Sequence, residues 1–240
     1  MGCWYEDHFQ EDYLKIYNHR NNNAGTELQN IMNFIPYKER QKILDLCCGA
    51  GRHSRWFADQ KLEVTGVDLS IALLQEAKKQ LNSEEITYVR SDMREINFDN
   101  EFDIVANLFT SFGYFEEDSE NERVFSRVYS ALKKGGYFLF DYLNPLFIEG
   151  NLVPFSQNSI DDTTIYEYRK IIKDTVVKRI IMKDLYSKRS YEERVKLYSE
   201  KQIKKMLERN NLKPLHLFGN YDGSPYFARS SPRLIYICQK

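Results

Sequence analysis

A short glycine turn between an apolar segment and a polar segment has the clearest chemical use in this chain. Residues 42–54 read KILDLCCGAGRHS, which predicts a buried strand, a turn at Gly49 and Gly51, and a helix that begins directly afterwards. Glycine has no Cβ, so backbone amides can approach a ligand closely, and the N-terminus of the helix points at the same place. The pattern predicts a cofactor-binding turn.

A second candidate is Asp68, which ends the predicted strand 62–67 and lies 19 residues after Gly49. An acidic side chain at about this distance in a βαβ unit binds the hydroxyls of a ribose, although Asp68 could instead cap a helix near Ser70. A dinucleotide site would need a third glycine where Ser54 stands, and its pyrophosphate fits poorly with Asp45. A dinucleotide is therefore disfavoured.

Taken together, Asp45, the turn 49–51 and Asp68 resemble the first two motifs of class I S-adenosylmethionine-dependent methyltransferases. Residues 91–94 (SDMR), the predicted strand 102–108 and the segment 132–143 resemble the later motifs and follow in the family's order. The resemblance covers roughly residues 40–143 and departs at Cys47, where many relatives have glycine. It is strongest with the small-molecule type, similar to glycine and amino-sugar N-methyltransferases.

This resemblance implies S-adenosylmethionine as the cofactor, with Asp68 on the ribose, Asp92 on the adenine amino group and Met93 over the adenine ring. The residues expected to bind the cofactor are Tyr17, Arg20, Asp45, Cys47, Gly49, Gly51, Asp68, Leu69, Asp92, Met93, Asn107 and Leu108. The residues expected to contact the acceptor are Tyr13, Phe112 and Tyr114. Helix capping or turn formation is the alternative for Asp68 and Asp92, and ordinary core or surface packing is the alternative for Tyr13, Tyr17, Phe112 and Tyr114. Methyl transfer is an in-line displacement that depends on alignment, so no catalytic residue is assigned.

Composition limits the partners. The chain has 34 basic and 35 acidic residues and a formal charge of −1, so no overall field draws it to nucleic acid or to an anionic membrane. No stretch approaches the 18 apolar residues of a membrane span. The four cysteines have neither metal-binding nor disulfide spacing. We expect a cytoplasmic monomer or homodimer with no metal and a small-molecule acceptor.

The order of predicted elements indicates an α/β fold. Two helices in 5–36 precede strands at 43–47, 63–67, 86–90, 102–107 and 137–142, with helices at 52–60, 70–81 and 121–132. This alternation predicts a Rossmann-like, seven-stranded, mostly parallel sheet with helices on both faces. The last two strands, about 213–218 and 233–239, follow a helix that Ser199 and Gln202 begin with a capping box.

Period-two alternation in 164–172, 176–186 and 190–198 predicts a small antiparallel sheet inserted after the fifth strand, as a lid. The expected division is 1–143 for the N-terminal helices and cofactor-binding core, 144–198 for the inserted sheet, and 199–240 for the last helix and strands. The sequence thus favours a methyltransferase that acts on a nitrogen or oxygen of a small molecule. An RNA or protein methyltransferase and a non-catalytic S-adenosylmethionine-binding protein remain alternatives.

Overall fold

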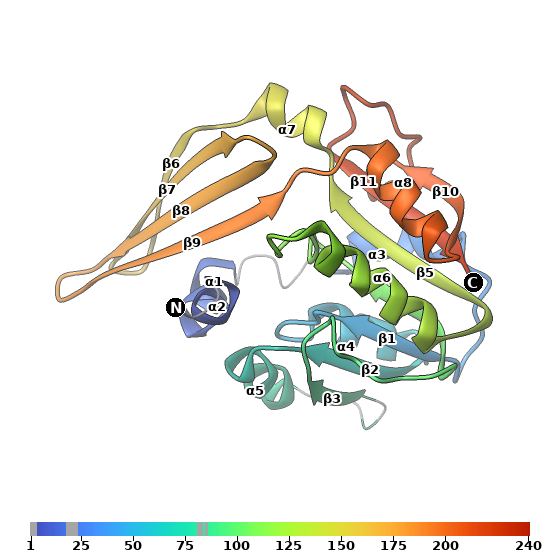
Figure 1. Ribbon diagram of the computed structural model, residues 1–240. Helices are drawn as coiled ribbons and strands as arrows, with labels where there is room; N and C mark the ends of the chain where they lie inside the picture. Colours follow the sequence, from blue (N-terminus) through green and yellow to red (C-terminus); the bar gives the residue numbers. More distant parts are fainter. Residues whose placement is uncertain (1–3, 18–23, 81–83, 85) are drawn as a thin grey trace.

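Two sheets organise the chain in the computed structural model, which describes residues 4–17, 24–80, 84 and 86–240. The larger sheet has seven strands in the order β10-β11-β5-β4-β1-β2-β3 (Figure 1). Its strands are β1 (Lys42–Leu46), β2 (Glu63–Asp68), β3 (Ile86–Arg90), β4 (Phe102–Asn107), β5 (Leu132–Leu143), β10 (Lys213–Phe218) and β11 (Arg233–Gln239). Strands β1 to β5 pair in parallel, whereas β11 is antiparallel to both β5 and β10. The predicted Rossmann-like fold is confirmed.

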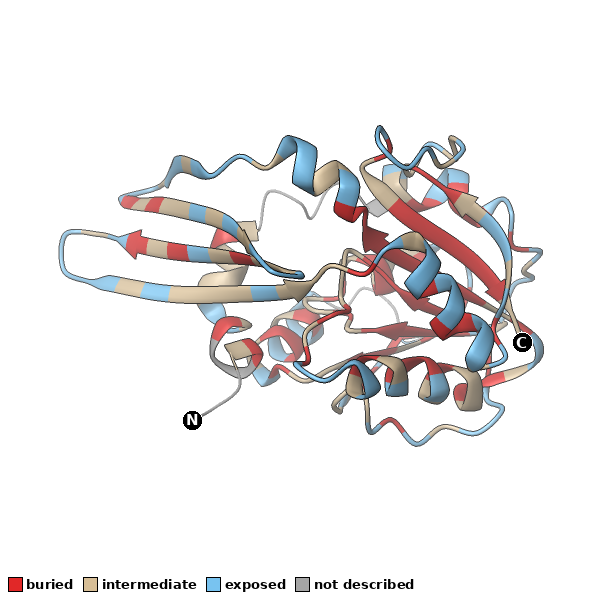
Figure 2. Ribbon diagram, turned by 45° about the horizontal axis from the view of Figure 1, so that its top comes forward, coloured by how far each residue is buried: buried red, intermediate tan, exposed pale blue. Residues whose placement is uncertain are grey.

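Helices cover both faces of the larger sheet, which is why its central strands are apolar along most of their length. One buried cluster joins the sheet to α6 (Asp118–Ala131) and α8 (Glu200–Arg209). The opposite cluster joins it to α3 (Ala24–Met32), α4 (Arg52–Asp59) and α5 (Ile71–Lys79). Figure 2 shows the buried strands between these layers. The carboxyl ends of the parallel strands therefore remain the open edge of the fold.

The inserted sheet follows α7 (Pro145–Asn151) and is antiparallel, with the strand order β6-β7-β8-β9. Its strands are β6 (Phe155–Ile160), β7 (Thr163–Ile172), β8 (Thr175–Lys183) and β9 (Lys188–Lys196). The sequence predicted only the last three. Strand β6 reads FSQNSI and is mostly exposed, so it carries no apolar alternation. Helix α7 was missed because Asn144-Pro145 was taken as a break, although proline is favoured at the first position of a helix.

The prediction of two helices before the first strand is wrong, because three lie in the described residues: α1 (Trp4–His8), α2 (Glu11–Tyr17) and α3. Helices α1 and α2 lie beside the inserted sheet (Figure 1). Ile16 of α2 packs in a cluster with Ile165, Ile180 and Met182 of that sheet. The N-terminal segment thus joins the inserted sheet to the rest of the molecule.

Two further boundaries differ from prediction. Helix α6 begins at Asp118 instead of Asn121, and β5 begins at Leu132 instead of Tyr137. The early start of β5 includes Gly135 in a left-handed conformation and Gly136, where a Cβ would lie 2.9 Å from the Lys133 carbonyl oxygen. Among the described residues, no helix has the length and apolar character needed to cross a membrane.

The predicted capping box of α8 is present and supports a stability test. The Ser199 hydroxyl accepts from the Gln202 amide, and the Gln202 side-chain oxygen accepts from the Ser199 amide at 3.0 Å. Ser199→Ala should therefore lower the free energy of unfolding in urea by about 1 kcal/mol. Lys201→Ala, at an exposed position of the same helix, should change it by less than about 0.5 kcal/mol. Equal values for the two variants would show that the cap does not stabilise the fold.

Candidate functional site

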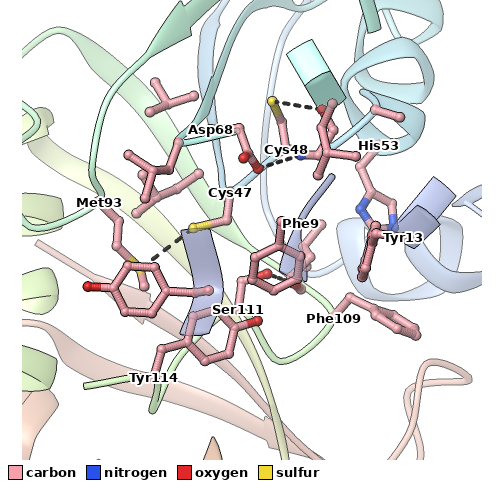
Figure 3. A pocket seen from close by; sticks show the side chains of 18 of the residues that line it. Phe9, Tyr13, Cys47, Cys48, His53, Asp68, Met93, Phe109, Ser111 and Tyr114 are labelled. Atoms are coloured by element: carbon pink, nitrogen blue, oxygen red, sulfur yellow. Dashed lines mark hydrogen bonds between the residues drawn. The ribbon is translucent and has the colours of Figure 1, made fainter. Parts of the chain in front are cut away.

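One pocket lies where the parallel strands end, which is where open α/β sheets bind ligands. The carboxyl ends of β1, β2, β3 and β4 form its floor, and α1, α2 and the segment 108–115 form its walls (Figure 3). The pocket brings together ten of the predicted site residues: Tyr13, Tyr17, Cys47, Gly49, Asp68, Leu69, Asp92, Met93, Leu108 and Tyr114. Segments far apart in the sequence thus meet at a single cavity.

The glycine turn is held by Asp68. Its carboxylate accepts from the Gly49 amide at 2.8 Å and from the Ser70 amide at 2.9 Å. Burial raises the pKa of Asp68, and the two amides oppose that rise. The N-cap of α5 is Ser70, whose hydroxyl accepts from the Leu73 amide. Asp68 therefore ties the turn after β1 to the end of β2 and also lines the pocket.

Asp45 and Gly51, which were predicted to bind the cofactor, are not among the residues that line the pocket. Asp45 is buried and accepts from the Ser54 hydroxyl at 2.6 Å, so it secures the first turn of α4. Gly51 has φ 74°, and a Cβ there would lie 2.0 Å from the Tyr88 hydroxyl oxygen. Both residues shape the turn from behind: Asp45 holds the helix start, and Gly51 admits the Tyr88 ring.

Asn107 and Phe112 are also outside the lining. Asn107 is buried, and its amide donates to the Leu46 carbonyl oxygen at 3.2 Å, between neighbouring strands. Phe112 is fully buried and stacks on Phe125 with ring centroids 4.7 Å apart. The structure therefore places the Phe112 side chain in the core and not among the residues that line the pocket. The predicted contact of Arg20 lies outside the described residues.

At the end of β3, Asp92 is paired with Arg94. Its carboxylate accepts from the Arg94 amide at 2.8 Å and from the Arg94 guanidinium at 2.6 Å. Burial alone would raise the pKa of Asp92, but the hydrogen bonds from Arg94 and its charge lower it. The guanidinium also lies 4.0 Å from the centre of the Phe115 ring. Asp92 is therefore held as an oriented carboxylate at the pocket.

Cys47 gives the pocket floor an apolar, unreactive surface. Burial raises its pKa well above the usual value, and the nearby carboxylates of Asp68 and Asp45 raise it further. Its sulfur lies 3.6 Å from that of Met93. A neutral thiol is a poor nucleophile. The described residues contain no group of three His, Cys, Asp or Glu side chains placed to hold a metal.

Several lining residues were not in the predicted site. Arg52 and His53 of α4 both line the pocket and share Glu27, whose Oε2 lies 2.6 Å from Arg52 Nη1 and 3.0 Å from His53 Nε2. Burial would raise the pKa of Glu27, but the bond from His53 and the charge of Arg52 lower it. Phe109, just after β4, lies under the Arg52 guanidinium at 4.9 Å. The position of Phe109 directly after β4 is the sequence signal that could have identified it as a site residue.

The N-terminal wall is a row of aromatic rings. Phe9, Tyr13 and Tyr17 follow one another with ring centroids 5.0 and 4.5 Å apart, and Phe9 lies 5.9 Å from Tyr114. The carbonyl oxygen of Phe9 accepts from the Ser70 hydroxyl, which ties this wall to the start of α5. Phe9 was missed because it lies in a short break between α1 and α2 that periodicity does not show.

Glu193 of β9 connects the aromatic wall to the inserted sheet. It accepts from the Tyr17 hydroxyl at 2.7 Å, and the same oxygen lies 2.7 Å from His8 Nε2. The Lys178 ammonium of β8 donates to the Tyr17 hydroxyl and lies 2.6 Å from Oε1 of Glu167 of β7. Burial would raise the pKa of Glu193, but His8, Lys178 and Tyr17 together lower it to about 2. A carboxylate is thus kept charged at the junction.

The seven-stranded sheet, the glycine turn and the acidic residues that end β2 and follow β3 are arranged as in the Rossmann-like methyltransferase fold. In agreement, residues 43–136 match the family model described as a methyltransferase domain. Relatives that are 39 and 36% identical match 105 and 103 residues. The chain spans 42% of the length of each of these two curated relatives.

Other comparisons extend over more of the chain. It is 23% identical to the cypemycin N-terminal methyltransferase of a Streptomyces species, over 81% of this chain and 82% of that protein. It is 27% identical to the dTDP-3-amino-3,4,6-trideoxy-alpha-D-glucopyranose N,N-dimethyltransferase of Streptomyces venezuelae, over 55 and 56% respectively. The crystal structure of an S-adenosylmethionine-dependent methyltransferase from Clostridium acetobutylicum superposes with a TM-score of 0.79 at 20% identity. That superposition covers 95% of this chain and 97% of the other, so the shared fold includes the inserted sheet.

Because the Asp68 carboxylate accepts hydrogen bonds from two backbone amides, substitutions of Asp68 should affect both the affinity for the cofactor and the stability of the fold. Asp68→Ala should weaken S-adenosylmethionine binding by about ten- to a hundredfold and lower the free energy of unfolding by about 1 to 3 kcal/mol, because two amides lose their acceptor. Asp68→Asn, which can still accept a hydrogen bond, should lose affinity but retain more of the stability. Calorimetric titration and urea unfolding measure the two quantities. Asp59→Asn, at an exposed position of α4, is the control, and a wild-type affinity in Asp68→Ala would contradict the assignment.

The lowered pKa of Glu193 predicts a pH dependence of stability. A carboxyl whose pKa falls on folding stabilises the native state above its unfolded pKa of about 4.3, and this stabilisation is lost as pH falls toward 2. Between pH 5 and 2, the free energy of unfolding should therefore fall by about 1 to 3 kcal/mol more in the wild type than in Glu193→Gln. Urea unfolding at a series of pH values measures this. Glu192→Gln should follow the wild-type curve, and parallel curves for Glu193→Gln would refute the prediction.

Proposed function

We propose that this chain transfers a methyl group from S-adenosylmethionine to a small-molecule acceptor through a nitrogen or oxygen nucleophile. The observation that carries the proposal is the pocket at the carboxyl ends of the parallel strands, which has the cofactor-type residues on its floor and an aromatic wall facing them. The N-terminal helices and the inserted sheet would act as a lid over it. This arrangement would exclude water from the reacting atoms.

The residues present suit the cofactor. A Cβ at Gly49 would meet only Leu73, at 3.9 Å, so this side of the turn has room for a ligand. The Asp68 and Asp92 carboxylates are acceptors suited to the ribose hydroxyls and the adenine amino group, and Met93 would cover the ring. When bound, S-adenosylmethionine supplies an electrophilic methyl group on sulfur. The neutral Cys47 and the apolar Leu108 would surround that group without competing as nucleophiles.

The protein's own part in the reaction would be alignment. Burial raises the pKa of Tyr114 well above its usual value, so its phenol stays protonated and cannot serve as a base. The hydroxyl donates to the Thr110 carbonyl oxygen at 3.0 Å, which leaves its lone pairs to accept from an acceptor molecule. Tyr13 and Tyr114 would therefore place the nucleophile, and an amine that arrives neutral needs no base.

Two observations support a nitrogen nucleophile on a small molecule. Of the relatives from Streptomyces species, one is named as an N-terminal methyltransferase and the other as an N,N-dimethyltransferase of an amino sugar. The chain's formal charge of −1 also provides no general attraction to RNA. The three described cysteines are free, which suits the proposed reducing cytoplasm.

Methyl label identifies the acceptor class directly. The wild type should transfer label from S-adenosylmethionine into the small-molecule fraction of a metabolite extract. Tyr114→Leu should lower that turnover at least tenfold while changing the calorimetric affinity for S-adenosylmethionine less than threefold, because it would position the acceptor and not the donor. Tyr186→Ala, at a side chain that is 96% exposed, is the control. Label in RNA or protein would establish the macromolecular alternative, and tight binding without transfer would indicate a non-catalytic protein.

A further inference from the structure

A buried carboxylate outside the pocket holds the pocket wall that follows β4. Asp141 of β5 is fully buried, and its side chain accepts four hydrogen bonds. They come from the Phe109 amide at 2.7 Å, the Tyr221 hydroxyl at 2.5 Å, and Nε and Nη2 of Arg233 at 2.7 Å each. Asp141 thereby connects β5, the start of β11, the loop before β11 and the segment after β4.

The segment it holds has an unusual backbone. Phe109 and Thr110 have φ angles of 60° and 63°, and neither is glycine. Such a conformation is sterically unfavourable for a residue with a Cβ and persists only where the surroundings impose it. Here the Thr110 amide donates to the Asp141 carbonyl oxygen, and Arg233 Nη2 donates to the Thr110 hydroxyl at 2.8 Å. The Asp141–Arg233 pair therefore supplies the bonds that favour this turn.

The turn decides which side chains reach the pocket. Phe109 and Ser111 line it, whereas Thr110, Asp141 and Arg233 do not. Figure 3 shows Phe109, Ser111 and Tyr114 along one side, across from Asp68. Relaxation of Phe109 to a negative φ would turn this wall away from the cavity.

A buried ion pair of this kind is not explained by stability alone. Desolvation of two charges often cancels their attraction, so an apolar replacement of equal volume would serve packing equally well. What an apolar pair cannot do is bond to the Phe109 amide and the Thr110 hydroxyl at the same time. The fork of Arg233 contacts both Asp141 oxygens and Thr110, which a lysine cannot reproduce.

We propose that Asp141 and Arg233 are positioning residues that hold Phe109 and Thr110 in the left-handed conformation and so set the wall of the cofactor pocket. The inference rests on the proposed function, because it concerns S-adenosylmethionine binding at the same site.

Rescue by glycine tests this mechanism. Arg233→Lys keeps the charge but loses the fork, so its dissociation constant for S-adenosylmethionine should rise about three- to tenfold in calorimetry. Glycine adopts a positive φ without steric cost, so Arg233→Lys/Thr110→Gly should return to within about twofold of the wild type. Thr110→Gly alone should bind normally. Ile203→Ala, in the core of α8, is the control for lost stability and should leave the affinity unchanged.

Hydrogen exchange provides a second readout at the wall itself. Amide exchange in residues 108–114 should quicken in Arg233→Lys and, more mildly, in Tyr221→Phe, which removes one hydrogen bond to Asp141 and leaves the ion pair. Exchange in residues 200–209 should not change. Normal affinity in Arg233→Lys, or no recovery with Thr110→Gly, would overturn the proposal. A wild type that does not bind S-adenosylmethionine would instead refute the proposed function, and exchange at 108–114 would still decide whether the pair orders the wall.

Discussion

The structure depends on the burial of β1 between β2 and β4. Ile43, Leu44 and Leu46 are fully buried, and the strand pairs in parallel on both edges. Apolar side chains on both faces make any other placement of this segment costly, because each would expose surface worth about 1.5 to 3 kcal/mol per side chain. The position at which β1 ends in the sheet is therefore fixed, and the glycine turn must begin at that position. The Asp68 carboxylate then closes the turn by accepting a hydrogen bond from the Gly49 amide.

Four buried or partly buried carboxylates lie around the pocket, and each holds a neighbouring segment of the chain in place. Asp45 bonds to Ser54, Asp68 to two amides, Asp92 to Arg94, and Asp141 to Phe109. An unpaired buried carboxylate would be costly, so every one of these bonds constrains the chain strongly. The reaction proposed here needs alignment more than acid or base chemistry, and a pocket held by such bonds suits alignment.

The second sheet contributes to the pocket indirectly. Its strands do not line the cavity, but Glu193 and Lys178 bind Tyr17, and Ile165, Ile180 and Met182 pack on Ile16. The wall formed by α2 is therefore supported from behind by residues that lie 161 and 176 positions later in the chain. Movement of either element would be transmitted to the aromatic rings that face the cofactor floor.

The sequence alone determined the large sheet, the glycine turn, Asp68 and Asp92, because strand periodicity, glycine spacing and strand-end acids are local signals. It also indicated the inserted sheet and the cap at Ser199. Only the tertiary structure decided which residues face the cavity. Phe112 and Tyr114 are two positions apart, yet Phe112 enters the core and Tyr114 the pocket, because the backbone turns between them at Gly113, which has φ 84°. A left-handed turn at Phe109 and Thr110 precedes them. The residues that bond to that turn, Asp141 and Arg233, lie 32 and 124 residues beyond Phe109, and no local pattern encodes such a pairing.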